Sequence, residues 1–273
     1  MIPLHLKKVR SMTTAGSSSF AKEERFSRLE DPARDFPFYN GAPASISSGQ
    51  WLFVMAMVVV GFLVLALPIR WPGGAFAQFI PSVLMPLIPL AALAYVAPGH
   101  WKAIFGKVGG REIKLMFGFA VLNIVVSMGV GAIVFALTTV TPNAATALLS
   151  GLGTAERILF FAKIVPQLFG EEVITFLPFL ALLQLLSKGF GFSRKAAIIG
   201  AWLISAVIFG LIHLPTYNWN LIQCIVIIGS ARLILTLPWI MTKNIWVSTG
   251  AHIANDWLLL AMGLLGASLV GKG

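Results

Sequence analysis

The stretch ILFFAKIVPQLFGEEVITFLPFLALLQLL, residues 158–186, decides how this chain folds. It is longer than the roughly 20 apolar residues that a helix needs to cross a bilayer. Because backbone groups in lipid must form their hydrogen bonds within the segment, a run of this length indicates a transmembrane helix. Two adjacent carboxylates, Glu171 and Glu172, interrupt it, although a charge at the bilayer centre costs roughly 2.5–3.5 kcal/mol. These glutamates therefore need a compensating role.

The rest of the chain has the same apolar character. It has 273 residues, of which 58% are hydrophobic and 11% charged, whereas soluble domains average about 25% charged residues. We therefore predict an all-α, polytopic membrane helical bundle with about seven transmembrane helices. The expected spans are residues 51–67, 75–96, 115–140, 158–186, 196–214, 221–241 and 245–270.

The positions of the basic residues predict the orientation. Residues 1–50 and the connections after the second, fourth and sixth spans hold fifteen of the twenty lysines and arginines. Lysine and arginine favour the cytoplasmic side, so we expect the N-terminus in the cytoplasm. This bias, facing anionic lipid, explains the net charge of +10 without nucleic-acid binding. We expect residues 1–50 to form a flexible cytoplasmic tail and residues 51–270 the transmembrane domain.

Ionisable side chains gather in the second half of the chain. Beyond position 112 there are four acidic residues, and the three that fall in predicted spans are Glu171, Glu172 and Asp256. The histidines His213 and His252 fall in spans as well. A structural ion pair with Lys163 or Arg232 is one explanation for the buried acids. We favour a shared functional cavity, because ionisable groups within spans usually mark functional sites.

Three short motifs follow one another along these spans. They are Gly170-Glu171-Glu172, then Phe209 followed four residues later by His213, then His252 followed four residues later by Asp256. In this order they resemble the EExxxR, FxxxH and HxxxN or HxxxD motifs of the CAAX prenyl protease type II and bacteriocin-processing (CPBP, Abi) family. The resemblance covers about residues 155–262. It implies an all-helical membrane core and an intramembrane endopeptidase that cleaves near the C-terminus of a lipidated or hydrophobic peptide or protein.

One position departs from the family pattern. The family's arginine would fall at position 176, where this chain has Phe176. That arginine would be a counter-charge for the acidic pair. We predict that Arg232, in the sixth predicted span, supplies the missing positive charge to Glu172. Arg232 could also extend to the membrane interface or bind a substrate carboxylate.

The resemblance also implies roles for the site residues. Glu171 and His213 would hold and activate a water, with Glu172 in support. His252 would stabilise the oxyanion. Asp256 stands where the family often has an amide, and we expect its carboxylate to orient a positively charged His252. We expect three further residues to support the catalytic ones: Phe209, Arg232 and Asn255.

A metal mechanism is the rival chemistry. Glu171, His213 and His252 form the minimal ligand set of a catalytic zinc site. No HExxH helix is present, which argues against an obligatory metal. Zinc is still possible, and no cofactor is certain. The predicted span ends also place these residues at different depths. A common site requires the fifth helix to end, or the last helix to start, inside the bundle, with residues 214–220 lining a cavity.

Two other functions fit the same residues. One is a non-enzymatic bacteriocin-immunity or partner-binding membrane protein, which the departure at Phe176 favours. The other is a proton- or ion-coupled transporter, although the sequence shows no inverted repeat with broken helices. We predict the protease, acting on a hydrophobic or lipidated substrate in contact with membrane lipid. The location we expect is the bacterial inner (plasma) membrane.

Overall fold

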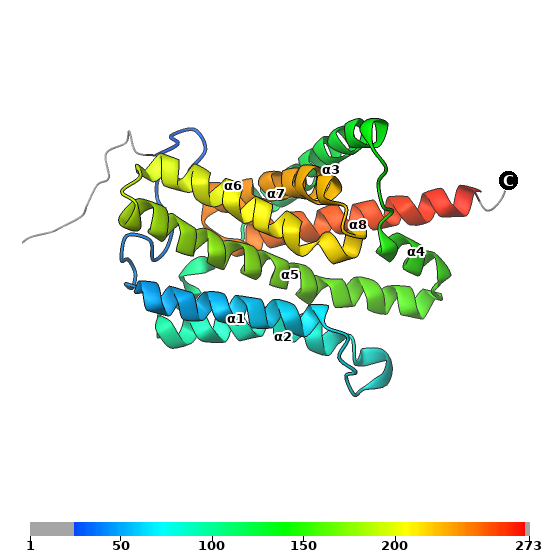
Figure 1. The fold of residues 1–273 in the computed structure, drawn as a ribbon, viewed down its shortest axis with the longest axis horizontal. Helices are drawn as coiled ribbons and strands as arrows, with labels where there is room; N and C mark the ends of the chain where they lie inside the picture. Colours follow the sequence, from blue (N-terminus) through cyan, green and yellow to red (C-terminus); the bar gives the residue numbers. More distant parts are fainter. Residues whose placement is uncertain (1–24, 271–273) are drawn as a thin grey trace, which may run out of the picture.

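A computed structural model describes residues 25–270 of the chain, and the regular secondary structure of this part is helical, without a β-strand (Figure 1). Residues 1–24 of the expected tail lie outside the described residues. The α-helices are α1 (Ser48–Ala66), α2 (Phe79–Val96), α3 (Gly110–Leu137), α4 (Ala144–Gly151), α5 (Thr154–Gln184), α6 (Arg194–Ile212), α7 (Gly229–Thr242) and α8 (Ile245–Val270). Short 3-10 helices are η2 (Gly74–Phe76), η3 (Trp101–Ile104) and η5 (Leu214–Tyr217), and π-helical segments are η4 (Leu185–Gly189) and η6 (Gln223–Ile228).

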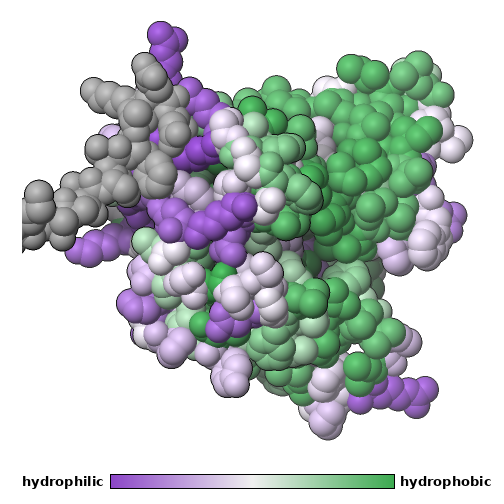
Figure 2. Space-filling model, turned by 60° about the vertical axis from the view of Figure 1, so that its left-hand side comes forward, coloured by the Kyte–Doolittle hydropathy of each residue, from purple (hydrophilic) through white to green (hydrophobic). Residues whose placement is uncertain are grey.

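The chain is an integral membrane protein. Six helices of the described part are long and apolar enough to cross a bilayer: α1, α2, α3, α5 with η4, α6, and α7 with η6. The seventh expected span, α8, is a helix of 26 residues but is not in this set. Large apolar side chains such as Leu52 and Phe135 lie on the outer surface. Figure 2 shows hydrophobic residues over the side of the bundle and hydrophilic ones beside its N-terminal end.

The helix α5 is the centre of the bundle. It packs against α1 and α2 on one side and against α6 and α8 on the other (Figure 1). The helix α3 packs against α7 and α8. Two prolines, Pro166 and Pro178, lie inside α5, which continues through both of them. The helix that carries Glu171 and Glu172 therefore contacts most of the other elements that could supply partners.

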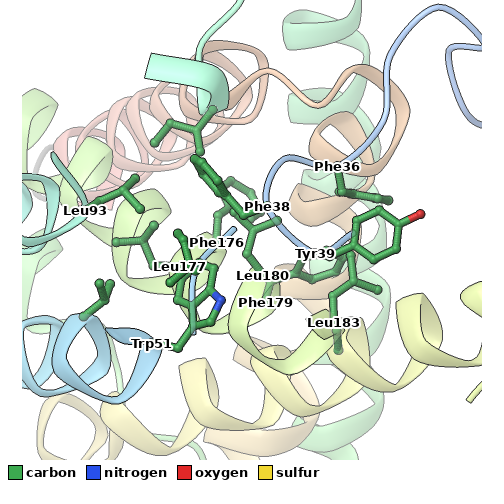
Figure 3. Close-up of a cluster of buried hydrophobic side chains, with 14 of the residues drawn as sticks. Phe36, Phe38, Tyr39, Trp51, Leu93, Phe176, Leu177, Phe179, Leu180 and Leu183 are labelled. Atoms are coloured by element: carbon green, nitrogen blue, oxygen red, sulfur yellow. The ribbon is translucent and has the colours of Figure 1, made fainter. Parts of the chain in front are cut away.

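The described part of the N-terminal segment is packed, which corrects the expectation of a flexible tail up to residue 50. Phe36, Phe38 and Tyr39 are each less than 5% exposed, and they lie among side chains of α5 and α1 (Figure 3). The Phe36 ring lies 5.3 Å from that of Phe179 and 6.2 Å from that of Trp239. Aromatic burial of this extent contributes strongly to packing. Residues 25–47 therefore form part of the folded core.

Buried ion pairs hold this segment in place. Glu30 accepts hydrogen bonds from Arg194 at the start of α6 and from Lys243 after α7. Burial by itself raises the pKa of Glu30, but the hydrogen bonds from Arg194 and Lys243 outweigh it and lower the pKa to about 2. Asp35 makes a second ion pair with Arg194 at 2.7 Å. The segment thus ties together the ends of α6 and α7.

The same contacts bury the start of the last helix. Lys243, Asn244 and Ile245, at the turn between α7 and α8, are fully buried. The last helix therefore starts inside the bundle, underneath residues 25–47. At the other side of the bundle α6 ends at Ile212, and Leu214–Tyr217 follows as the 3-10 helix η5. A common site was expected to need either an early end of α6 or a start of the last helix inside the bundle, and the buried start of α8 fits the second alternative.

Candidate active site

The two glutamates are positioned by close packing of α5. A Cβ atom at Gly170 would lie 2.9 Å from Met85 Sδ and 3.0 Å from Pro86 Cδ of α2. Glycine at this position therefore lets α5 approach α2. The next two side chains on the helix point about 100° apart. Glu171 and Glu172 consequently meet different partners, and both are buried.

Glu172 forms a buried ion pair with Arg232. The guanidinium Nη1 and Nη2 lie 2.6 and 3.0 Å from the two carboxylate oxygens, and neither side chain is exposed. The guanidinium also lies over the rings of Phe176 and Phe209, at 5.5 and 5.0 Å from their centroids. Phe176 stacks on Trp239 with ring centroids 4.7 Å apart. The positive charge beside Glu172 thus comes from α7, and the position of the family's arginine holds an aromatic ring under it.

His252 on α8 joins the two glutamates. Its Nδ1 lies 2.7 Å from Glu172 Oε1, and because an ionised carboxylate can only accept, Nδ1 carries the hydrogen. Its Nε2 lies 3.8 Å from Glu171 Oε2 and 3.7 Å from Asp256 Oδ1. We expected Asp256 to orient His252. The structure gives that short contact to Glu172 instead.

The two long contacts of His252 Nε2 lead to two carboxylates, Glu171 and Asp256. Distances of 3.7 and 3.8 Å are too long for direct hydrogen bonds, and polar contacts at such distances are commonly bridged by water. Glu171 accepts a hydrogen bond from Gln167, one turn earlier on α5, at 3.2 Å. Glu171, Asp256 and His252 Nε2 are therefore the polar groups that face one another here.

Sequence reasoning missed two residues near these groups. Gln167 is one of them, and the sequence pattern that could have identified it is its four-residue spacing to Glu171. Asn123 of α3 is the other: it is 1% exposed, and its Nδ2 donates to Asn255 Oδ1 at 3.0 Å. Asn255 in turn donates from Nδ2 to Asp256 Oδ1 at 2.9 Å. Asn123 is the one residue with a side-chain amide in the sequence of α3, and this feature could have identified it from the sequence.

His213, which we expected to act together with Glu171, bonds to the backbone of its own helix. It caps the C-terminal end of α6, and its Nδ1 bonds to the carbonyl oxygen of Phe209 at 2.7 Å. Its ring lies 4.5 Å from the Phe209 ring, which lies 6.4 Å from the ring of His252. Within residues 25–270 His213 makes no ion pair with Glu171. The hydrogen bond to Phe209 therefore occupies the Nδ1 atom of His213.

The expected zinc ligands do not meet as a set. Nowhere in the described part of the chain do three or more histidine, cysteine or acidic side chains gather so that they could hold a metal ion. His213 in particular is engaged with Phe209. A site for zinc needs at least three protein ligands at about 2.0–2.3 Å from one ion. Glu171, His213 and His252 do not fit that requirement.

The comparison with known families places these residues in a wider group. The sequence model of the type II CAAX prenyl endopeptidase Rce1-like family matches residues 153–258. This range runs from the start of α5 to just past Asp256, so it includes all three motifs and leaves out Asn123. No curated protein and no solved structure matches the chain. The resemblance inferred from the motifs is confirmed: residues 153–258 match the type II CAAX prenyl endopeptidase Rce1-like family, and this match supports a CAAX-type intramembrane protease at the level of that family.

Proposed function

We propose that the chain is an intramembrane endopeptidase whose nucleophile is a water held between Glu171, Asp256 and His252. The observation that carries this proposal is the pair of distances from His252 Nε2, 3.8 Å to Glu171 and 3.7 Å to Asp256. A water between these groups would accept from one donor and donate to two carboxylates. That arrangement aligns and polarises it for attack.

The reaction then follows general-base hydrolysis. Glu171 takes one proton from the water as its oxygen attacks the carbonyl carbon of the scissile peptide bond. The C–N bond breaks when Glu171 returns that proton to the leaving nitrogen. The products are a new carboxyl group, which releases its proton to solvent, and a new amine, and the enzyme regains its starting protonation state. A positioned general base of this kind accelerates such reactions typically by 10²–10⁴-fold.

Glu172 and Arg232 support the reaction without touching the substrate. The Glu172 carboxylate holds the Nδ1–H of His252, which directs Nε2 to the reacting water. Arg232 neutralises Glu172, so the carboxylate can remain buried. A protonated His252 would then donate from Nε2 to the developing oxyanion. In this proposal His252 stabilises the oxyanion, as the family resemblance implies. Glu172, and not Asp256, orients the His252 ring.

An apolar groove indicates the substrate class. It has a volume of about 540 Å³ and lies between α3, α5 and α8, the last two being the helices that carry Glu171 and His252. Its walls are almost entirely apolar; they are formed by Val108, Met116, Val165, Pro166, Phe169, Trp246, Thr249, Gly250 and Ile253. A groove of this size accommodates a hydrophobic side chain or a lipid chain. We therefore propose a hydrophobic or lipidated peptide as the substrate.

Peptide cleavage by the full-length protein in liposomes tests the function. The wild type is compared with Glu171→Gln, which keeps the shape of the side chain and removes the base, on prenylated and unmodified apolar peptides. Glu156→Gln is a matched control, because Glu156 is an exposed glutamate at the start of the same helix. We expect Glu171→Gln to lose at least about 100-fold in kcat/KM and Glu156→Gln to be unchanged. Full peptide cleavage by Glu171→Gln would contradict the proposed base. A cellular phenotype that Glu171→Gln retains without cleaving any peptide would favour a partner-binding protein instead.

A further inference from the structure

The N-terminal segment sends one aromatic ring to the two helices that carry the buried ion pair. Phe36 is 1% exposed, and its ring lies 5.3 Å from that of Phe179 on α5 (Figure 3). The Phe36 ring also lies 6.2 Å from that of Trp239 on α7. These two helices hold Glu172 and Arg232. Phe36 lies outside residues 153–258, the segment that matches the family model, so the family motifs assign it no role.

Three successive contacts lead from Phe36 to the ion pair. The ring of Trp239, which Phe36 contacts, stacks on Phe176 with centroids 4.7 Å apart and an interplanar angle of 18°. The Arg232 guanidinium lies over the Phe176 ring, at 5.5 Å from its centroid. Its two terminal nitrogens bond to Glu172. We call the three rings of Phe36, Trp239 and Phe176 the aromatic ladder, and it ends under the charge that stabilises Glu172.

The position of Trp239 depends on these ring contacts. Its side chain is fully buried, and within residues 25–270 its Nε1 atom has no hydrogen-bond partner. A buried indole N–H usually finds a partner, and leaving it unpaired is unfavourable. Because no hydrogen bond fixes the indole, the rings around it determine where it lies. A smaller side chain in place of Phe36 would therefore leave the indole free to move.

The same segment also holds the turn between α7 and α8. Lys243, at this turn, donates a hydrogen bond to Glu30 at 2.7 Å and lies over the Phe36 ring, at 4.8 Å from its centroid. The backbone N–H of Asp31 donates to the carbonyl oxygen of Met241 at 2.9 Å. The helix before this turn carries the guanidinium of the ion pair, and the helix after it carries the imidazole that bonds to the same carboxylate. The segment therefore contacts both helices at the point where they join.

We propose that Phe36 is a positioning residue that acts through the aromatic ladder to hold Arg232 against Glu172. The inference rests on the proposed function, in which Glu172 orients His252 for the reaction. When a smaller side chain replaces Phe36, the indole and the Phe176 ring shift, and the guanidinium above them loses its fixed position. Glu172 then holds the imidazole less firmly, so the chemical step slows. The apolar groove is lined by other residues, so substrate binding changes little.

The test measures the coupling between Arg232 and Glu172 with and without the Phe36 ring. The full-length wild type and Phe36→Leu each serve as the background for a double-mutant cycle of Arg232→Leu and Glu172→Gln in lipid–detergent micelles. The coupling factor is the ratio by which the unfolding constant of the double variant departs from the product of the two single effects. We expect this factor to fall by about 10-fold in the Phe36→Leu background. In liposomes kcat should fall by about 10-fold, and KM should change by less than about two-fold. Phe36→Met is the second variant if leucine prevents folding.

Phe38→Leu is the matched control. Phe38 belongs to the same segment and is fully buried, and its ring lies 6.3 Å from that of Trp51 on α1. We expect this variant to destabilise the protein to a similar extent and to leave the coupling factor and kcat unchanged. An unchanged coupling factor or an unchanged kcat in the folded Phe36 variants, or equal effects of Phe38→Leu, overturns the proposal. The coupling factor does not depend on turnover, so its fall in a chain that cleaves no peptide would refute the proposed function and retain the role of Phe36.

Discussion

Replacing Arg232 by leucine tests the electrostatic basis of the site. The substitution leaves Glu172 buried, with His252 as its remaining partner at 2.7 Å. It removes two charge-assisted hydrogen bonds, at 2.6 and 3.0 Å, and two ring contacts of the guanidinium. Leucine keeps the apolar packing but not the charge.

The expected loss of stability is large. Hydrogen bonds to charged groups contribute about 1.5–3 kcal/mol each, and a cation over a ring adds about 0.5–2 kcal/mol. The added apolar burial of leucine offsets part of this loss. Breaking a buried ion pair by removing one partner costs about 3–5 kcal/mol, because the other charge remains buried. We therefore expect Arg232→Leu to lower the free energy of unfolding by about 3–5 kcal/mol.

A double-mutant cycle separates the pair from its surroundings. Glu172→Gln alone leaves Arg232 buried without a counter-charge and should cost a similar amount. The double variant has neither charge, so we expect it to cost less than the sum of the two by about 3 kcal/mol or more. The assay is reversible unfolding by a denaturing detergent in lipid–detergent micelles, followed by tryptophan fluorescence. A coupling energy below about 0.5 kcal/mol would refute the claim that Arg232 stabilises Glu172.

Three further predictions test other parts of the structure. In Arg232→Leu, the additional change Phe176→Arg should restore part of the lost stability in the same assay, because an arginine four residues after Glu172 on α5 faces its carboxylate; no recovery would show that the charge must come from α7. Filling the apolar groove with Val165→Trp should raise KM for a lipidated peptide by about 10-fold and change kcat little, whereas Ile158→Trp on the exposed side of α5 should change neither; equal effects would exclude the groove as the substrate site. The pKa of Glu30 is lowered from 4.5 to about 2 in the folded chain, so its contribution to stability is present above pH 4.5 and is lost as the pH falls from 4.5 toward 2. By acid-induced unfolding we expect Glu30→Gln to lack about 3 kcal/mol of that pH-dependent loss, and an identical acid profile would contradict the buried ion pairs.

The sequence was sufficient for the fold class and the order of the motifs. A helix in lipid satisfies its own backbone, so the length and composition of each apolar run predict it without knowledge of its neighbours. The same holds for spacings within one helix, such as His252 and Asp256, because the helical repeat places them on one face. The resemblance to the family followed from three such local patterns, and it is confirmed by the match over residues 153–258.

The N-terminal segment shows where local reading fails. Its mixture of charge, serine, glycine and proline is typical of a solvated tail, yet Phe36 and Phe38 are buried and Glu30 is paired with Arg194 and Lys243. Those partners lie more than 150 positions away in the sequence. The composition of a segment does not reveal that distant charges will neutralise it.

The partners within the site were likewise decided by the tertiary structure. The sequence by itself determined which acidic, basic and histidine residues lie inside the expected spans: Lys163, Glu171, Glu172, His213, Arg232, His252 and Asp256. It did not determine that Glu172 bonds to His252, that His213 turns back to its own helix, or that Asn123 reaches Asn255. These contacts depend on the depth and rotation of whole helices, which are set by packing across the bundle and not by the residues adjacent in sequence.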